Sequence, residues 1–161
     1  MTTDDVDLVW NEISRIGTCM MTTHDGPMMR ARPMVGAADR SAGTIWFVTN
    51  RCFHKDDELR SDPRVCLSYC DSLTDTFVSV YGRASLSADR GRIEDLWNPT
   101  IDALFEHGVS DLDALLIAVR PELAEVWDGS HDDVLSALET LTAAAPQAAS
   151  GGCGESYKIR M

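Results

Sequence analysis

The segment TIWFVTNRCFHKDDEL (residues 44–59) combines a strong strand signal with a group of basic side chains. Its first six residues are β-branched or aromatic, which predicts a strand that ends near Asn50. Three basic residues, Arg51, His54 and Lys55, follow immediately, and residues 54–63 predict a short helix that stops before a proline. Because the formal net charge of the chain is −12, this group of basic residues needs an explanation.

Basic residues are concentrated between residues 30 and 64. This segment holds seven of the 14 Lys and Arg residues and five of the 26 Asp and Glu residues, so it carries +2 and the remainder −14. Two interpretations are open at this point. One is a solvated face with ordinary ion pairs. The other is a local anion site suited to a phosphate, for which Arg offers a planar fork and Lys a point charge.

Length and composition predict one globular domain and exclude several classes of protein. The 161 residues are 44% hydrophobic and 25% charged, which suits a single core. We expect no membrane helix and no secretory signal, and the acidity argues against nucleic acid and anionic membranes as partners. Five cysteines without CxxC spacing predict reduced thiols in a cytoplasmic protein, and no metal site.

The residue pattern predicts a mainly β protein with flanking helices. Strands are expected at residues 18–24, 28–38, 44–49, 64–70, 76–87, 114–120, 122–128 and 155–161. Helices are expected at residues 4–16, 54–62, 89–97, 98–108 and 132–145. Short connections without alternating crossover helices favour an antiparallel barrel over a doubly wound parallel sheet. We expect residues 1–144 to form the domain and residues 145–161 a flexible linker and tail.

Two prolines, Pro33 and Pro121, restrict how the predicted strands can pair or continue. Pro33 cannot donate to a ladder, so its strand is expected at an edge or at a bulge. Pro121 is expected to separate the strand that ends at Arg120 from the strand that follows it.

One constellation of residues predicts a binding site. Arg32 lies on a predicted strand, Thr49 ends the next strand, and His54 and Lys55 begin a helix. If the two strands are neighbours, Arg32 and Lys55 converge on one anion, and the helix N-terminus adds free N–H groups and partial positive charge. The apolar strands then supply a dry wall for a flat ring. Flavin mononucleotide (FMN) has the phosphate, chain and ring that such surfaces suit.

At these residues the sequence resembles the flavin-binding split-barrel superfamily that includes pyridoxamine 5′-phosphate oxidase, and in particular its general stress protein branch. Seven motifs carry the resemblance in the family's order: RPM (32–34), GTIWFVTN (43–50), HKDDEL (54–59), DPRVCLSYCD (62–71), VSVYGRASLSADR (78–90), LWNP (96–99) and AEVWDG (124–129). The resemblance implies a six-stranded antiparallel split β-barrel of Greek-key type. It also implies a homodimer with one flavin in each of two clefts at the subunit interface.

The resemblance further implies roles for single residues. Arg32 and Lys55 match the pair that binds the FMN phosphate. The other matches are Val48 and Thr49 beside the ribityl chain and phosphate, the strand of Pro33, Met34 and Val35 along the ring, and Trp127, which approaches the flavin from the partner subunit.

Three departures from the family pattern qualify this picture. Phe53 and His54 stand where the family often has a hydroxyl residue and an arginine, so His54 must donate in the arginine's place or phosphate binding is weaker. Phe77 replaces a glutamine that binds flavin in the oxidase, which removes one polar contact. The segment after Trp127, DGSHDDVLSAL, is acidic and lacks the oxidase's basic residues, so oxidation of pyridoxine phosphate is not expected.

We therefore expect an FMN-binding protein with oxidoreductase activity on an unidentified small-molecule electron donor or acceptor. The cofactor would supply the redox chemistry, and no general acid or base is identifiable. Three alternatives stay open: a non-enzymatic protein that stores or senses flavin in a stress response, a relative that uses FAD, deazaflavin or heme, and a barrel without cofactor, which Phe53 and Phe77 make conceivable.

Overall fold

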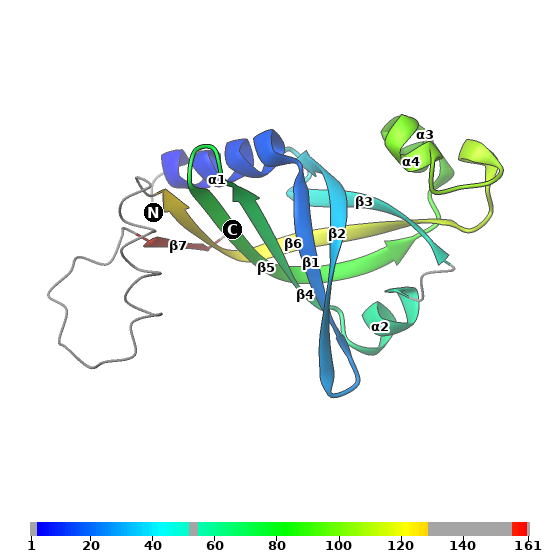
Figure 1. The fold of residues 1–161 in the computed structure, drawn as a ribbon, viewed down its shortest axis with the longest axis horizontal. Coiled ribbons are helices and arrows are strands. Elements are labelled where there is room, and N and C mark those ends of the chain that lie inside the picture. Colours follow the sequence, from blue (N-terminus) through cyan, green and yellow to red (C-terminus); the bar gives the residue numbers. More distant parts are fainter. Residues whose placement is uncertain (1–2, 52–54, 129–155, 161) are drawn as a thin grey trace, which may run out of the picture.

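The strands of the chain form one antiparallel sheet that closes on itself (Figure 1). The structure is a computed structural model that describes residues 3–51, 55–128 and 156–160. Its strands are β1 (Thr18–Asp25), β2 (Met28–Asp39), β3 (Thr44–Asn50), β4 (Arg64–Asp71), β5 (Thr76–Ser87), β6 (Ala114–Asp128) and β7 (Ser156–Arg160). Its helices are α1 (Thr3–Ile16), α2 (Lys55–Ser61), α3 (Arg90–Leu96), α4 (Pro99–Asp102) and the 3₁₀ turn η2 (Gly108–Ser110).

Six strands make the barrel and the seventh lies outside it. The order in the sheet is β3-β2-β1-β4-β5-β6-β7, and an additional antiparallel pairing of β3 with β6 closes the ring. β7 pairs with the C-terminal half of β6. The predicted mainly β fold, a six-stranded antiparallel barrel with helices around it, is confirmed.

Alternate side chains of the strands fill the barrel, as the period of two along a strand requires. Large side chains without measurable exposure include Met21, Phe47, Leu67 and Val80, each from a different strand. α1 lies across one end of the barrel, and its buried stripe of Val9, Trp10 and Ile13 belongs to the same core. Gly17 ends this helix with φ of 72°, a conformation that glycine adopts without steric cost.

The two predicted strands on either side of Pro121 form one continuous strand, β6, which corrects the expectation of two. Pro121 lies opposite Gly82, where the register between β5 and β6 shifts, so the strand bends there without ending. A Cβ atom at residue 82 would lie 2.4 Å from the carbonyl oxygen of Arg120, and only glycine allows this approach.

β2 changes partners along its length, and this change opens the barrel. Residues 28–35 pair with β1, whereas residues 36–39 pair with β3. Within the described residues, the stretch around Pro33 therefore has a strand on one side only, as expected for a proline that cannot donate to a second ladder. On the N-terminal side of Gly36, β2 and β3 part from each other and leave room between them.

A second, smaller hydrophobic cluster lies beside this opening, where α3 and α4 flank the end of β3 (Figure 1). Its buried members include Val48, Ile93 and Ile101. α3 begins after the predicted N-cap, Asp89, whose carboxylate accepts from the backbone N–H of residue 92. The helix predicted over residues 98–108 is one turn, α4, because the next residues form i→i−3 hydrogen bonds instead.

Two expectations concern the C-terminal part of the chain. β7 is present within the last stretch, residues 155–161, where a short strand was expected. The helix expected at residues 132–145 and the domain boundary near residue 145 lie outside the described residues. Among the described helices, none has the length and apolar character needed to cross a membrane.

Candidate functional site

A cavity of about 540 Å³ lies where β2 and β3 part. Its walls come from β2, the end of β3, the start of β1, and the residues of α4 and just after it. The lining residues are Thr18, Arg30, Arg32, Pro33, Met34, Val35, Val48, Thr49, Thr100, Ile101 and Leu104. Most of this lining is apolar, and the two arginines are its charged members, both from β2.

Six of the ten predicted cofactor-binding residues line this one cavity. They are Arg32, Pro33, Met34, Val35, Val48 and Thr49. The sequence placed these residues on two strands, and the structure brings the strands together at the opening. The grouping itself is therefore an observation, whereas the binding role stays a prediction.

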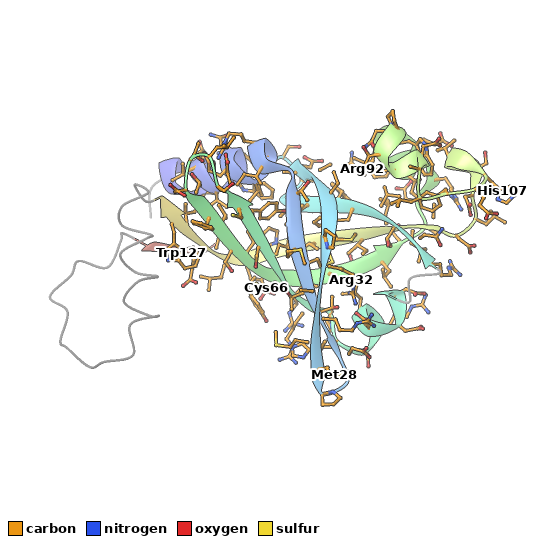
Figure 2. All side chains as sticks on the ribbon, in the orientation of Figure 1. Met28, Arg32, Cys66, Arg92, His107 and Trp127 are labelled. Carbon is orange, nitrogen blue, oxygen red and sulfur yellow. The ribbon has the colours of Figure 1, made fainter. Side chains whose placement is uncertain are left out.

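Of the four other predicted residues, two lie wholly or partly outside the described part of the chain, and the other two are not among the described lining residues. Lys55 is the first residue of α2, but its side chain lies outside the described part, as does all of His54. Phe77 and Trp127 face each other across β5 and β6. Figure 2 shows Trp127 and Arg32 far apart within the chain. Trp127 therefore does not reach the cavity of its own chain.

Arg32 meets an anion that the sequence pattern did not predict, the carboxylate of Glu58 on α2. Arg32 Nη2 donates to both carboxylate oxygens, at 2.9 and 2.8 Å. Arg32 Nη1 donates to the hydroxyl of Thr23 at 2.8 Å, and the same hydroxyl donates to Glu58 Oε2 at 2.6 Å. The Arg32 side chain is 15% exposed and that of Glu58 only 6%, so this is a largely buried ion pair.

Arg30 adds a second, more exposed cation to the same carboxylate. Its Nη1 lies 3.1 Å from Glu58 Oε1 and 3.2 Å from Asp25 Oδ2. Burial alone would raise the pKa of Glu58. The hydrogen bonds from Thr23 and Arg32, together with the charges of Arg32 and Arg30, outweigh burial and hold that pKa below its ordinary value. Glu58 is therefore ionised at neutral pH.

The sequence contained signals for two of these missed residues. Glu58 follows Lys55 by three positions, so both share one face of a helix. Thr23 is paired with Arg30 in the antiparallel ladder, which places it diagonally opposite Arg32. Neither signal predicts the orientation of the short helix α2. Glu58 meets Arg32 because of that orientation. α4 supplies part of the wall through Thr100 and Ile101, for which we found no sequence signal.

The outer face of the sheet carries a row of uncharged side chains that crosses five strands. The row runs along paired positions of β2, β1, β4, β5 and β6: Ala31, Thr22, Cys66, Tyr81 and Leu123. Large apolar side chains elsewhere on this face, including Met20 and Trp127, are also exposed, the latter by 36%. Among the described residues, no group of three His, Cys, Asp or Glu side chains could hold a metal ion.

Fold and cavity define a six-stranded antiparallel barrel protein with a mostly apolar cavity and a largely buried arginine at its edge. Comparison with known proteins gives the family. The family model described as "Pyridoxamine 5′-phosphate oxidase like" matches residues 4–150. The chain therefore belongs to the pyridoxamine 5′-phosphate oxidase-like family, and the resemblance noted from its motifs is confirmed.

Solved structures support the same placement. The chain is similar to the general stress FMN/FAD binding protein of Xanthomonas citri, with a TM-score of 0.69 and 26% identity over 80% of this chain and 92% of that one. It also shares its fold with General Stress Protein 26 of Bacillus anthracis, with a TM-score of 0.66 and 18% identity over 75% of this chain and 95% of that one.

One curated relative shares more sequence over a shorter region. Protein bli-3 of Neurospora crassa is 37% identical over 89 residues, which are 53% of this chain and 43% of that protein. The match thus spans less than half the length of this relative.

Proposed function

We propose that this protein binds a flavin, FMN, in the cavity between β2 and β3 and uses it in redox chemistry. The observation that carries the proposal is the position of Arg32, a largely buried cation at the edge of a cavity whose remaining walls are mostly apolar. A flavin nucleotide needs this combination, because its phosphate is charged and its ring is flat and largely apolar. The FMN/FAD binding named for the Xanthomonas citri relative supports the same ligand class.

The residues present fit such a ligand. Arg32 and Lys55 would hold the phosphate, with His54 as a further donor in the segment between β3 and α2. Val48 and Thr49 would border the ribityl chain, and the β2 backbone from Pro33 to Val35 would run along the ring. When bound, a flavin supplies one- and two-electron transfer, and the protein supplies orientation and exclusion of water.

A homodimer would complete the site. The uncharged row on the outer face of the sheet, together with exposed apolar side chains of that face such as Met20, offers a surface that a second copy can cover, since exposed apolar patches mark interaction sites. The same face carries Phe77 and Trp127, which lie away from the cavity of their own subunit. We propose that these two side chains approach the flavin of the partner subunit.

The substrate is an unidentified small-molecule electron donor or acceptor. Residues 128–138 hold three acidic residues and no Lys or Arg. An anionic pyridoxine phosphate would be repelled there, so we do not propose vitamin B6 oxidation. A non-enzymatic role in storing or sensing flavin is the second candidate, and the general stress names of the structural relatives favour it.

The decisive experiment is to purify the protein without added cofactor, record its visible spectrum and identify any released chromophore by mass spectrometry. We expect a flavin spectrum and FMN. Release of FAD would keep the site but change the cofactor, and a colourless protein that also fails to bind added FMN or FAD would refute the proposal.

A double substitution tests the assigned residues. Arg32→Ala with Lys55→Ala is expected to lose flavin on gel filtration, because both phosphate-binding cations are removed. Arg60→Ala is the matched control, since this substitution removes a cation from the same helix but lies outside the cavity lining. Equal flavin retention in the double variant and the control would contradict the site assignment.

A further inference from the structure

The buried carboxylate of Glu58 has no counterpart in the phosphate site as the sequence predicted it. A carboxylate beside a phosphate-binding arginine repels the phosphate, so its presence calls for a reason. Burial of a charge is also costly unless partners compensate it. Glu58 does have such partners, because Thr23, Arg32 and Arg30 all contact its two oxygens.

The contacts of Arg32 leave part of its guanidinium available. Within the described part of the chain, Nη2 bonds to Glu58 and Nη1 to Thr23, while Nε takes part in neither bond. A guanidinium carries five N–H donors in a rigid fork, so two partners on one side do not exhaust it. Arg32 also lines the cavity. It can therefore keep Glu58 and still donate to an anion inside the cavity.

Glu58 also connects Arg32 to the helix that begins with Lys55. The two α2 residues are three positions apart and share one helix face. The Glu58 bond thus fixes the β2 arginine relative to the first turn of α2. A long arginine side chain otherwise loses considerable rotamer entropy when it is held in one place for a ligand.

We infer that Glu58 is a positioning residue that holds Arg32 in the orientation in which it binds the phosphate of the flavin. This inference rests on the proposed function, since it presumes that a flavin phosphate reaches Arg32. Glu58 itself touches no ligand. Its contribution is to pre-order the guanidinium, and this contribution exceeds the repulsion between its charge and the phosphate.

The test is a comparison of two ligands, FMN and riboflavin, which differ by the phosphate alone. Dissociation constants are measured from flavin fluorescence for the wild type, Glu58→Gln and Asp56→Asn. Asp56 is the matched control, since it is a buried acid on the same helix that pairs with Arg60, at 3.9 Å, rather than with Arg32. Glu58→Gln should weaken FMN binding about tenfold, as expected for loss of a charge-assisted contact, and leave riboflavin binding unchanged.

The outcomes separate the inference from the proposed function. Equal or tighter FMN binding by Glu58→Gln would show that the carboxylate is neutral or competes with the phosphate, and would overturn the inference while the flavin site stands. Parallel losses for FMN and riboflavin, or the same loss in Asp56→Asn, would show a merely structural role and overturn it as well. A wild type that binds neither flavin would refute the proposed function and the inference together.

A second variant covers the case in which Glu58→Gln does not fold. Thr23→Val keeps the side-chain shape but removes the hydroxyl that bonds to both Arg32 and Glu58. It is expected to weaken FMN binding severalfold and to leave riboflavin binding unchanged. The criteria for accepting or rejecting the inference are the same as for Glu58→Gln.

Discussion

Two arginine–carboxylate pairs lie in different regions of the barrel. They share the same chemistry but differ in exposure and in their additional partners. At the cavity, Arg32 and Glu58 are 15% and 6% exposed and share their contacts with a threonine and a second arginine. Where α1 ends against β4, Arg15 and Asp71 are 44% and 17% exposed. Arg15 also pairs with Glu12 on its own helix, and Asp71 accepts from the backbone N–H of Leu73.

The pKa shifts of the two carboxyl groups show the difference in physical terms. For Asp71, the hydrogen bond from Arg15 is the main cause of a pKa lowered to about 2, and the effect of burial is smaller than that bond. For Glu58, burial is the largest effect and raises the pKa, and several partners must act together to reverse it. A surface pair forms at small cost and contributes little. The buried pair is costly, which points to a role beyond stability.

The largest expected effect is that of Arg32→Ala on stability. Removal of the arginine leaves the Glu58 carboxylate buried with weaker compensation, so the free energy of unfolding should fall by about 3 kcal/mol. Urea denaturation of the protein without flavin measures this change. If the variant is as stable as the wild type, the Arg32–Glu58 pair is not the buried, interdependent pair described here.

A double variant isolates the pair itself. Arg32→Met with Glu58→Met removes both charges, and replacement of a buried ion pair by apolar side chains is often neutral. Its stability should therefore lie well above that of Arg32→Ala. A double variant no more stable than the single one would mean that the loss comes from packing of the arginine stem rather than from an unpaired charge.

An effect of intermediate size is expected for the pH dependence of stability, to which Glu58 and Asp71 each contribute. Both folded-state pKa values are lowered. The stability that each group contributes is therefore fully present above its unfolded-state pKa of about 4. Each contribution disappears as the pH falls through the folded pKa. The stability difference between wild type and Glu58→Gln, or between wild type and Asp71→Asn, should therefore shrink on acidification.

Denaturation midpoints measured between about pH 6 and pH 2 provide the check. For Asp71→Asn the difference should persist until close to pH 2, the folded-state pKa of Asp71. Differences that grow on acidification would give the opposite sign and contradict the lowered pKa values.

The smallest expected effect is that of Arg15→Gln. Since this side chain is exposed, the substitution should shift the denaturation midpoint only slightly, and added salt should remove even that shift by screening. Midpoints at low and high ionic strength measure it. A shift comparable to that of Arg32→Ala would contradict the conclusion that the exposed pair contributes much less to stability than the buried pair.

The barrel, and about half of the residues that line the cavity, could be predicted from the sequence. Alternation of apolar and polar side chains marked the strands. The predicted site required β2 and β3 to be neighbours, and their ladder shows that they are. Arg32 and Thr49, expected to meet under that condition, both line the cavity. The position of Pro33 was also predictable, because a missing N–H restricts a residue to an unpaired side of a strand whatever surrounds it.

Other features depend on three-dimensional arrangements that a linear pattern does not encode. The orientation of α2 brings Glu58 to Arg32, and in a helix of seven residues the hydrophobic period is too short to fix that orientation. Pro121 was expected to end a strand, but the register shift at Gly82 lets β6 continue. The roles proposed for Phe77 and Trp127 depend on a second subunit, about which a single chain carries only indirect information.

The ladder between β3 and β6 also has a consequence for how the chain folds. This ladder joins residues as distant in sequence as Ile45 and Val119, and without it the sheet stays open. Loop-closure entropy opposes such long-range contacts until the intervening strands are in place. The hairpins of β1 with β2 and of β4 with β5 are local and can form early, so closure by β6 is a late event. The chain should accordingly fold more slowly than a helical bundle of its length.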